Sequence, residues 1–224
     1  MCRFMEKALV IGATGGIGRA IVSGLEAKGV QVTGVSRRDG LDVTKPETID
    51  HVLGGLSGPY DLIFVAIGIL ANDGGAPEKS LSALNAQVMH DVFAVNTIGP
   101  ALILRHAARL LPKDRRNVVG VLSARVGSIG DNQIGGWHTY RASKAALNQI
   151  VHGAAIELGR THKHSICVAL HPGTVETAFT AKYAGRHKTV SASEAADNLL
   201  NVMRALDGDA TGGFFDYAGT SVPW

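Results

Sequence analysis

The sequence predicts an α/β fold in which one doubly wound parallel sheet, with about seven strands, is covered by helices on both faces. Short apolar runs, which are typical of strands buried on both faces, alternate along the chain with longer stretches of helical periodicity. The 224 residues contain no linker-like, low-complexity or repeated segment. We therefore expect a single domain over residues 1–224.

Each element is predicted from its own local pattern. The first strand, residues 8–11, is apolar throughout and stops at Gly12, and the helix that follows it, residues 17–27, ends before Gly29. The same alternation predicts further strands at 31–35, 61–67, 117–122, 165–170 and 213–215. Further helices are predicted at 46–53, 80–111, 139–158 and 191–206.

Composition and charge argue against several classes of protein. Hydrophobic residues make up 46% and charged residues 18% of the chain, and the net charge is +3, with the basic residues scattered. We therefore expect a globular protein with no nucleic-acid partner. Cys2, Cys167 and the histidines lack metal-ligand spacing, so no metal is expected. No apolar run approaches the ~18 residues of a membrane span, which predicts a cytoplasmic protein without a membrane partner.

A glycine-rich loop follows the first predicted strand. Gly12, Gly16 and Gly18 allow a tight turn, a close approach to a pyrophosphate and close helix packing, and Thr14 and Ile17 lie between them. The helix behind the loop presents free N–H groups to the phosphates. A plain strand-to-helix turn would use similar residues, but the position after the first strand favours dinucleotide binding.

The second strand leads into Arg37 and Arg38, where a domain that binds a free ribose 2′-hydroxyl usually has an acidic residue. Either arginine can hold a 2′-phosphate through paired hydrogen bonds. The alternative is a solvated loop arginine. The pattern therefore favours NADP(H), with NAD(H) possible.

Tyr140 and Lys144 are four residues apart at the start of a predicted helix, so their side chains share one face. A nearby ammonium favours the phenolate, and we expect it to lower the tyrosine pKa toward neutrality. A pair on a solvated helix surface is the alternative. Combined with the glycine loop, the pair predicts proton-transfer catalysis.

Together these motifs resemble the short-chain dehydrogenase/reductase family over essentially the whole chain, and most closely its small C-factor-like reductases. The resemblance implies a Rossmann fold, with the G-x-x-x-G-I-G loop at positions 12–18 binding the cofactor. It also implies that Asp42 and Val43, after a third strand, contact the adenine.

The resemblance assigns further site residues. Ser123 corresponds to the serine that hydrogen-bonds the substrate oxygen, and Asn96 to the asparagine that holds a water linking Lys144 to solvent. A strand-end hydroxyl and an amide inside a helix are the respective alternatives. The remaining implied cofactor contacts are Gly68, Pro172, Gly173, Val175 and Thr177.

Three departures from the family pattern stand out. Ile11 replaces the usual threonine, and residues 66–68 read Ala-Ile-Gly where the family has Asn-Ala-Gly. The interval from Ser123 to Tyr140 is longer than usual, so the loop could place Trp137 and His138 at the substrate, although ordinary loop packing is an equal alternative.

The resemblance implies reduction of a small carbonyl compound or oxidation of the corresponding alcohol, with Tyr140 as general acid or base. The short segment 177–190 would cover the substrate, and a homodimer or homotetramer is implied. A cofactor-binding signalling or regulatory protein without turnover is the main alternative. A sugar-nucleotide epimerase is disfavoured because only about fifty residues follow Gly173.

Overall fold

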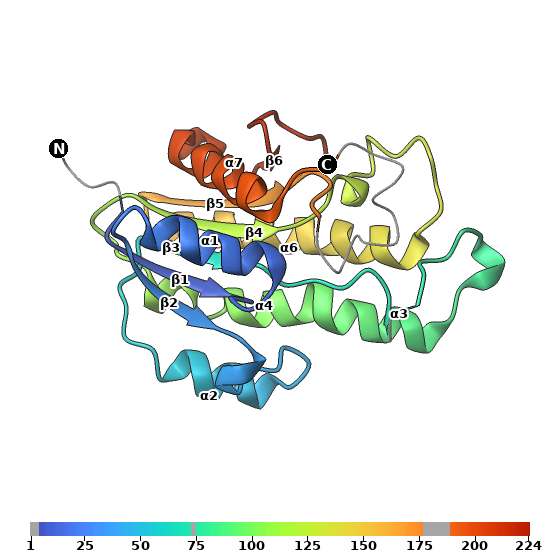
Figure 1. The fold of residues 1–224 in the computed structure, drawn as a ribbon, viewed down its shortest axis with the longest axis horizontal. Helices are drawn as coiled ribbons and strands as arrows, with labels where there is room; N and C mark the ends of the chain where they lie inside the picture. Colours follow the sequence, from blue (N-terminus) through green and yellow to red (C-terminus); the bar gives the residue numbers. More distant parts are fainter. Residues whose placement is uncertain (1–4, 73–74, 177–188) are drawn as a thin grey trace.

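The computed structural model describes residues 5–72, 75–176 and 189–224. These residues form one sheet of six strands in the order β2-β1-β3-β4-β5-β6, and every neighbouring pair is parallel (Figure 1). The strands are β1 (Lys7–Ile11), β2 (Gln31–Val35), β3 (Leu62–Val65), β4 (Asn117–Leu122), β5 (Ser165–His171) and β6 (Phe214–Asp216). The strand order reverses between β1 and β3, which is where such sheets bind ligands.

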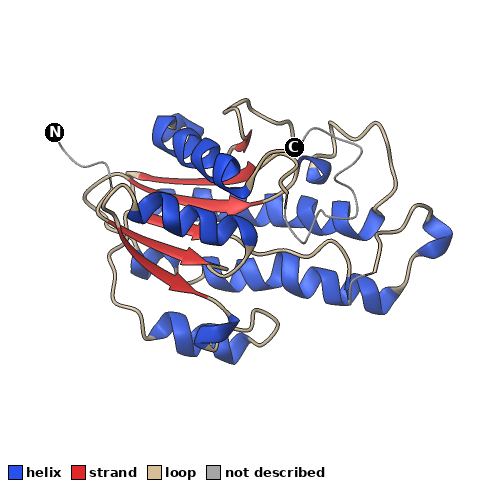
Figure 2. Ribbon diagram, in the orientation of Figure 1, coloured by secondary structure: helices blue, strands red, loops and turns tan. Residues whose placement is uncertain are grey.

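Helices cover both faces of the sheet (Figure 2). They are α1 (Gly16–Glu26), α2 (Pro46–Gly54), α3 (Ala86–Phe93), α4 (Gly99–Leu104), α5 (Ala107–Leu110), α6 (His138–Thr161) and α7 (Ala192–Ala205). Ile21 of α1 and Leu199 of α7 belong to the apolar cluster on one face. Ile49 of α2, Ile103 of α4 and Leu147 of α6 belong to the cluster on the other face. The predicted doubly wound α/β class is confirmed, and none of the described helices is long and apolar enough to cross a membrane.

The described residues contain six strands and not about seven, because no strand precedes Asp42. After β2 the chain enters a short 3₁₀ turn, η1 (Arg37–Asp39), closed by Gly40 at φ +86°. The Ser36 hydroxyl accepts a hydrogen bond from Arg38 N at 3.2 Å, and the Asp39 carboxylate accepts one from Ser36 N at 2.9 Å. This reciprocal cap reverses the chain immediately after β2, so too few residues remain for another strand.

The helix predicted over residues 80–111 is interrupted. A turn of 3₁₀ helix, η3 (Leu81–Ala83), precedes α3, and a π-helical turn, η4 (Ala94–Ile98), separates α3 from α4. Pro100 explains the π turn, because its ring would clash with the carbonyl of Asn96 in a regular α-helix and it has no N–H to donate. The interruption therefore falls at a predicted site residue.

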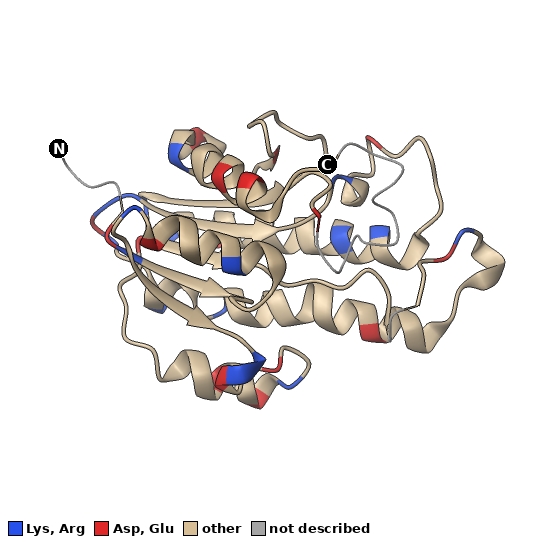
Figure 3. Cartoon of the chain, in the orientation of Figure 1, with Lys and Arg blue, Asp and Glu red and all other residues tan. Residues whose placement is uncertain are grey.

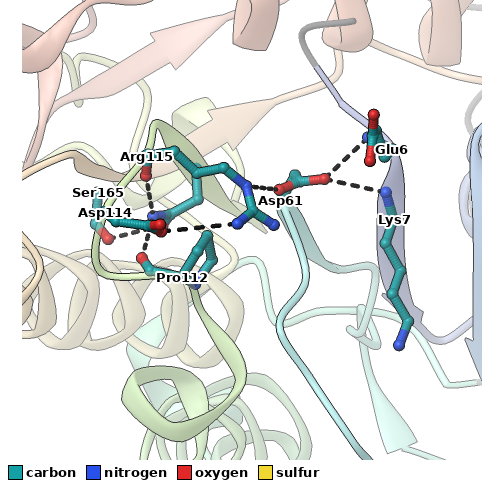
Figure 4. A network of polar contacts seen from close by, with 8 residues as sticks. Glu6, Lys7, Asp61, Pro112, Asp114, Arg115 and Ser165 are labelled. Carbon is teal, nitrogen blue, oxygen red and sulfur yellow. Dashed lines mark hydrogen bonds and ion pairs between the residues drawn. The ribbon is translucent and has the colours of Figure 1, made fainter.

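At the edge where the strands begin, a polar network connects β1, β3 and β4 (Figure 4). The buried Asp61 carboxylate accepts hydrogen bonds from the backbone N–H groups of Glu6 at 2.9 Å and Lys7 at 3.1 Å. Arg115 Nε donates to the same carboxylate at 2.9 Å. Every oxygen of this buried charge thus has a donor, as a structural role requires.

Candidate active site

The glycine loop between β1 and α1 has the geometry that the sequence predicts. Gly12 has φ +87°, and a Cβ placed on it would lie 2.4 Å from the carbonyl oxygen of Ala66. A Cβ on Gly18 would lie 2.1 Å from the Gly12 carbonyl oxygen. Gly12 N donates to the Val35 carbonyl at 2.8 Å, so the loop lies against the end of β2. Only glycine fits at positions 12 and 18 without moving backbone.

The N-terminus of α1 is open toward solvent. Thr14, Gly15 and Gly16 are exposed, and Ile17 is half-buried against the core. The residue that caps the helix, Gly15, offers no side-chain hydrogen bond, and no acidic residue lies in the first turn. Free N–H groups and the positive end of the helix dipole therefore remain available to an anion. These residues fit the diphosphate of a dinucleotide.

Arg37 and Arg38 are exposed on η1, directly after β2, whose last residue accepts the hydrogen bond from Gly12 N. Figure 3 shows basic and acidic positions side by side on the short turn that follows β2. The nearby acid does not compete with them for a ligand, because the Asp39 carboxylate is held by both the backbone N–H and the hydroxyl of Ser36, each at 2.9 Å. Ser36 itself is buried. The turn therefore presents two guanidinium groups beside the predicted ribose position, while Oδ2 of the Asp39 carboxylate is bonded to Ser36.

Asp42 and Val43 connect this region to α4. The Asp42 carboxylate accepts hydrogen bonds from the hydroxyl of Thr44 at 2.7 Å and from its backbone N–H at 3.0 Å, and these bonds lower the pKa of Asp42. Val43 packs so closely on Gly99 that a Cβ there would lie 2.8 Å from the valine Cβ. A contact of either residue with adenine stays a prediction.

Tyr140 and Lys144 lie on α6 and are both buried, with 6% and 3% of their surface exposed. Lys144 Nζ donates to the Leu122 carbonyl at 3.0 Å, at the last residue of β4 and next to Ser123. A Cβ on Gly68 would lie 3.2 Å from Lys144 Nζ and 3.5 Å from Asn96 Oδ1. The structure thus brings Lys144, Asn96, Gly68 and the start of the Ser123 loop together at the carboxyl ends of β3 and β4.

The electrostatics of the pair differ from the sequence-based expectation. Burial raises the pKa of the Tyr140 phenol above its ordinary value, whereas a lowered value was expected from the neighbouring ammonium. Burial also lowers the pKa of Lys144 to about 7, so the lysine itself is only partly charged at neutral pH. A phenol with this shift is a proton donor and not a phenolate at rest.

Asn96 is completely buried in the π turn η4, and its side chain is engaged in three hydrogen bonds. Its Oδ1 accepts from Ile69 N at 2.7 Å, and its Nδ2 donates to Ile69 O at 2.8 Å and to Ser143 Oγ at 3.0 Å. Ser143 Oγ in turn donates to the Tyr140 carbonyl at 2.8 Å. Asn96 therefore connects the loop after β3 to the first turn of α6, and a water held by it stays a prediction.

The loop after β5 carries the remaining predicted contacts. Gly173 has φ +77°, and a Cβ there would lie 3.0 Å from the ring of Tyr217. Pro172 precedes it, and the buried Val175 forms a bridge with Val190. Thr177 and all but two residues of the predicted covering segment 177–190 lie outside the described residues.

Trp137 lies immediately before α6 and contacts the candidate tyrosine. Its backbone has φ 50°, which is rare for a residue with a side chain, and its ring meets the Tyr140 ring edge-on with centroids 6.3 Å apart. Trp137 N donates to the Glu78 carbonyl at 2.5 Å, and the Glu78 carboxylate accepts from the Thr139 hydroxyl. That Trp137 and His138 line the substrate site stays a prediction, because these contacts also fit ordinary loop packing.

The sequence reasoning missed three residues of this site. Ser143 bridges Asn96 and Tyr140, and Asn148 accepts a hydrogen bond from Ser123 Oγ at 2.6 Å. His171 is the last residue of β5, and the carbonyl of the residue before it, Leu170, accepts a hydrogen bond from Ser123 N at 2.8 Å. Burial lowers the pKa of His171 to about 4. A signal existed for Asn148, because positions 140, 144 and 148 share one helical face.

Comparisons with known proteins agree with this geometry. Residues 12–207 match the sequence profile of a family described as enoyl-(acyl carrier protein) reductase. The 1-hydroxy-2-glutathionyl-2-methyl-3-butene dehydrogenase of Rhodococcus sp. (strain AD45) is 29% identical, with 98% of this chain and 100% of the relative covered. The C-signal of Myxococcus xanthus is 33% identical over 70% of this chain and 93% of its own length.

Solved structures give the same result. A short-chain dehydrogenase/reductase from Burkholderia multivorans with bound NADP superposes with a TM-score of 0.84 at 28% identity, covering 98% of this chain and 100% of that one. The family profile spans most of the sequence, and the fold and its carboxyl-edge site follow the same plan. The chain belongs to the short-chain dehydrogenase/reductase family of NAD(P)-dependent oxidoreductases.

Proposed function

We propose that the protein reduces a small carbonyl compound to an alcohol with NADPH, and catalyses the reverse oxidation when the alcohol is supplied. The observation that carries this proposal is that the segments bearing Tyr140, Lys144 and Asn96 meet the end of β4, next to Ser123. This meeting point lies at the carboxyl edge of the sheet, beside the open N-terminus of α1. A protein that only binds a dinucleotide has no need of this buried polar group.

The side chains divide the chemistry among them. A bound nicotinamide supplies or accepts the hydride. Tyr140 donates its phenolic proton to the substrate oxygen as negative charge develops there, and its raised pKa keeps that proton in place until the reaction. Ser123 hydrogen-bonds the same oxygen and stabilises the charge. Lys144 Nζ is held next to Ser123 by the Leu122 carbonyl, and in this proposal it returns a proton to the tyrosine.

Cofactor preference follows from the turn after β2. Arg37 and Arg38 are exposed there and their acidic neighbour Asp39 is occupied by Ser36, which favours a 2′-phosphate over a free hydroxyl. The Burkholderia multivorans relative is known with NADP bound. Both observations support NADPH as the cofactor. We propose that the rest of the cofactor contacts the remaining predicted residues, namely Gly68, Asp42, Val43, Pro172, Gly173, Val175 and Thr177.

The test begins with titration of NADPH and NADH into the purified protein, followed by cofactor absorbance with a panel of carbonyl compounds. We expect tighter binding of NADPH and turnover that falls by at least ~10³-fold in Tyr140→Phe, because the proton donor is removed. NADPH affinity of the variant should stay within twofold. A fully active Tyr140→Phe protein would rule out the proposed role of the phenol.

A second candidate function comes from the similarity to the C-signal of Myxococcus xanthus, a signalling protein by its name. In that case the cofactor site would serve regulation. Cofactor binding with no turnover on any carbonyl or alcohol of the panel would favour it. The same purified protein therefore distinguishes the two functions.

Assembly and location belong to the same proposal. Exposed apolar side chains on η4 and α6, namely Ile98, Ile150 and Ile156, support pairing of these helices in a homodimer or homotetramer of a cytoplasmic protein. We also propose, from the family resemblance, that segment 177–190 covers the substrate; residues 177–188 of it lie outside the described residues. Light scattering of the purified protein tests the assembly.

A further inference from the structure

Asn148 lies behind the proposed catalytic serine, one helical turn after Lys144 on the same face of α6. Its side chain and that of Ser123 are both buried, with 3% and 5% of the residue surface exposed. Ser123 Oγ and Asn148 Oδ1 are 2.6 Å apart. Ser123 thus has a fixed hydrogen-bond partner on α6.

One polar group of this pair has no hydrogen-bond partner when the Ser123 hydroxyl donates to Asn148 Oδ1. Asn148 Nδ2 is then buried with no hydrogen-bond partner among the described residues. An unsatisfied buried N–H is costly, and a carbonyl oxygen with spare capacity is less so. The oxygen and nitrogen of an asparagine are assigned from their partners, and exchanging them lets Nδ2 donate to Ser123 Oγ.

The surroundings of Asn148 agree with this exchange. Asn148 borders a cavity of about 280 Å³ between α6, η5 (Arg125–Gly127) and Trp224. After the exchange the amide oxygen takes the buried position of Nδ2, where an acceptor without a partner costs less than a donor without one. The exchanged orientation therefore leaves no buried donor without a partner.

We propose that Asn148 is a positioning residue for Ser123: its side-chain NH₂ donates to Ser123 Oγ, which turns the serine hydroxyl hydrogen toward the substrate oxygen. This inference rests on the proposed function for its catalytic meaning. A hydroxyl has one hydrogen to donate. If Ser123 gave that hydrogen to Asn148, only Tyr140 would remain to donate to the substrate oxygen, whereas the proposed direction supplies two donors to the developing charge.

Substitution of Asn148 by aspartate separates the two directions. A carboxylate has the shape of the amide but only accepts hydrogen bonds, so it would draw the Ser123 hydroxyl hydrogen away from the substrate. We expect Asn148→Asp at pH 8 to lose about 100-fold in kcat/KM, as much as Ser123→Ala, because one donor to the oxyanion is lost in each case. The double variant should lose no more than Ser123→Ala alone.

The pH profile adds a readout that a merely structural role would not change. At low pH the introduced carboxyl becomes protonated and can donate to Ser123 again, so activity relative to wild type should recover. Asn148→Ala leaves the hydroxyl free to rotate and should lose only about tenfold. Gln149→Glu, which places the same charge on the exposed neighbouring residue, is the matched control and should keep full activity.

A measurement without turnover completes the experiment. The side-chain NH₂ signals of Asn148, assigned by their loss in Asn148→Asp, should shift in Ser123→Ala because their acceptor is removed. Unmoved signals, or an Asn148→Asp protein that keeps wild-type activity at pH 8, would overturn the inference even if Asn148→Asp folds poorly. A shifted signal in a protein with no turnover would instead overturn the proposed reductase function and keep the hydrogen-bond direction.

Discussion

Asp61 and Lys144 are both buried ionisable side chains, but they lie at opposite edges of the sheet and have different partners. The Asp61 carboxylate receives two backbone N–H groups and the charged Arg115. Lys144 donates to the neutral carbonyl of Leu122, and none of the ion pairs found among residues 5–72, 75–176 and 189–224 includes it.

This difference indicates that Asp61 has a structural role and that Lys144 has a role in the proposed chemistry. Both carboxylate oxygens of Asp61 accept hydrogen bonds from donors at the start of β1 and before β4, so this side chain connects strands. Lys144 is held where burial lowers its pKa to about 7, so it can gain or lose a proton near neutral pH. A buried charge with incomplete compensation therefore identifies the functional edge of this sheet.

The largest effect that tests this comparison is loss of activity in Lys144→Met. Methionine fills the volume of the lysine stem but cannot exchange a proton with Tyr140 or hydrogen-bond a ligand. We expect kcat/KM for carbonyl reduction to fall by about 10³-fold, the upper range for a general acid-base group. Steady-state kinetics with NADPH measures it, and Lys113→Met, an exposed lysine after α5, is the control. Near-normal activity would place the proton route elsewhere.

The sequence predicted much of this arrangement because its signals are local. The glycine requirement at positions 12 and 18 and the sharing of one face by positions 140 and 144 follow from spacing alone, and the structure reproduces both. The cap formed by Ser36 and Asp39, which turns the chain directly after β2, is a contact between side chain and backbone that no periodicity reveals.

The partners of the site residues could not be predicted for a related reason. That Asn96 bonds Ile69 and Ser143, or that Ser123 faces Asn148, depends on how β3, β4, η4 and α6 pack together. The expected fall of the Tyr140 pKa was also wrong, because burial, which depends on the whole fold, raises the pKa of this phenol.

The next effect concerns the exposed arginines on the turn after β2. Replacing both Arg37 and Arg38 with alanine should weaken NADPH binding by about 30-fold and leave NADH binding nearly unchanged, because each lost contact to a 2′-phosphate removes a charge-assisted hydrogen bond. Fluorescence titration with both cofactors measures this. Equal weakening of NADPH and NADH binding would indicate that the arginines support the fold of the turn and do not bind the 2′-phosphate.

Asp61→Asn tests the structural half of the comparison. The amide keeps the shape of the carboxylate but removes the charge facing Arg115 and turns an N–H toward groups that already donate. We expect the free energy of unfolding to fall by about 2 kcal/mol, a moderate value because Arg115 is half exposed. Urea denaturation measures it. The activity of the folded variant should equal that of the wild type, and a selective loss of activity would contradict the division between the two edges.

The last prediction is a pH dependence of stability to which Lys144 contributes. The pKa of Lys144 is about 7 in the folded protein and near 10.5 when unfolded, so between these pH values the unfolded chain binds one more proton. The free energy of unfolding should therefore rise with pH across this window, by up to ~1 kcal/mol per pH unit from this group. Below pH 7 both states hold the proton and the contribution of the lysine becomes constant.

Other groups titrate in the same window, so the difference between wild type and Lys144→Met isolates this one. The variant lacks the buried amine and should be the more stable protein at pH 6, with its advantage shrinking as the pH rises toward 9. Urea denaturation of both proteins at pH 6, 7, 8 and 9 measures the difference. A constant difference would mean that Lys144 keeps an ordinary pKa in the folded protein, and its contrast with Asp61 would then lie in geometry alone.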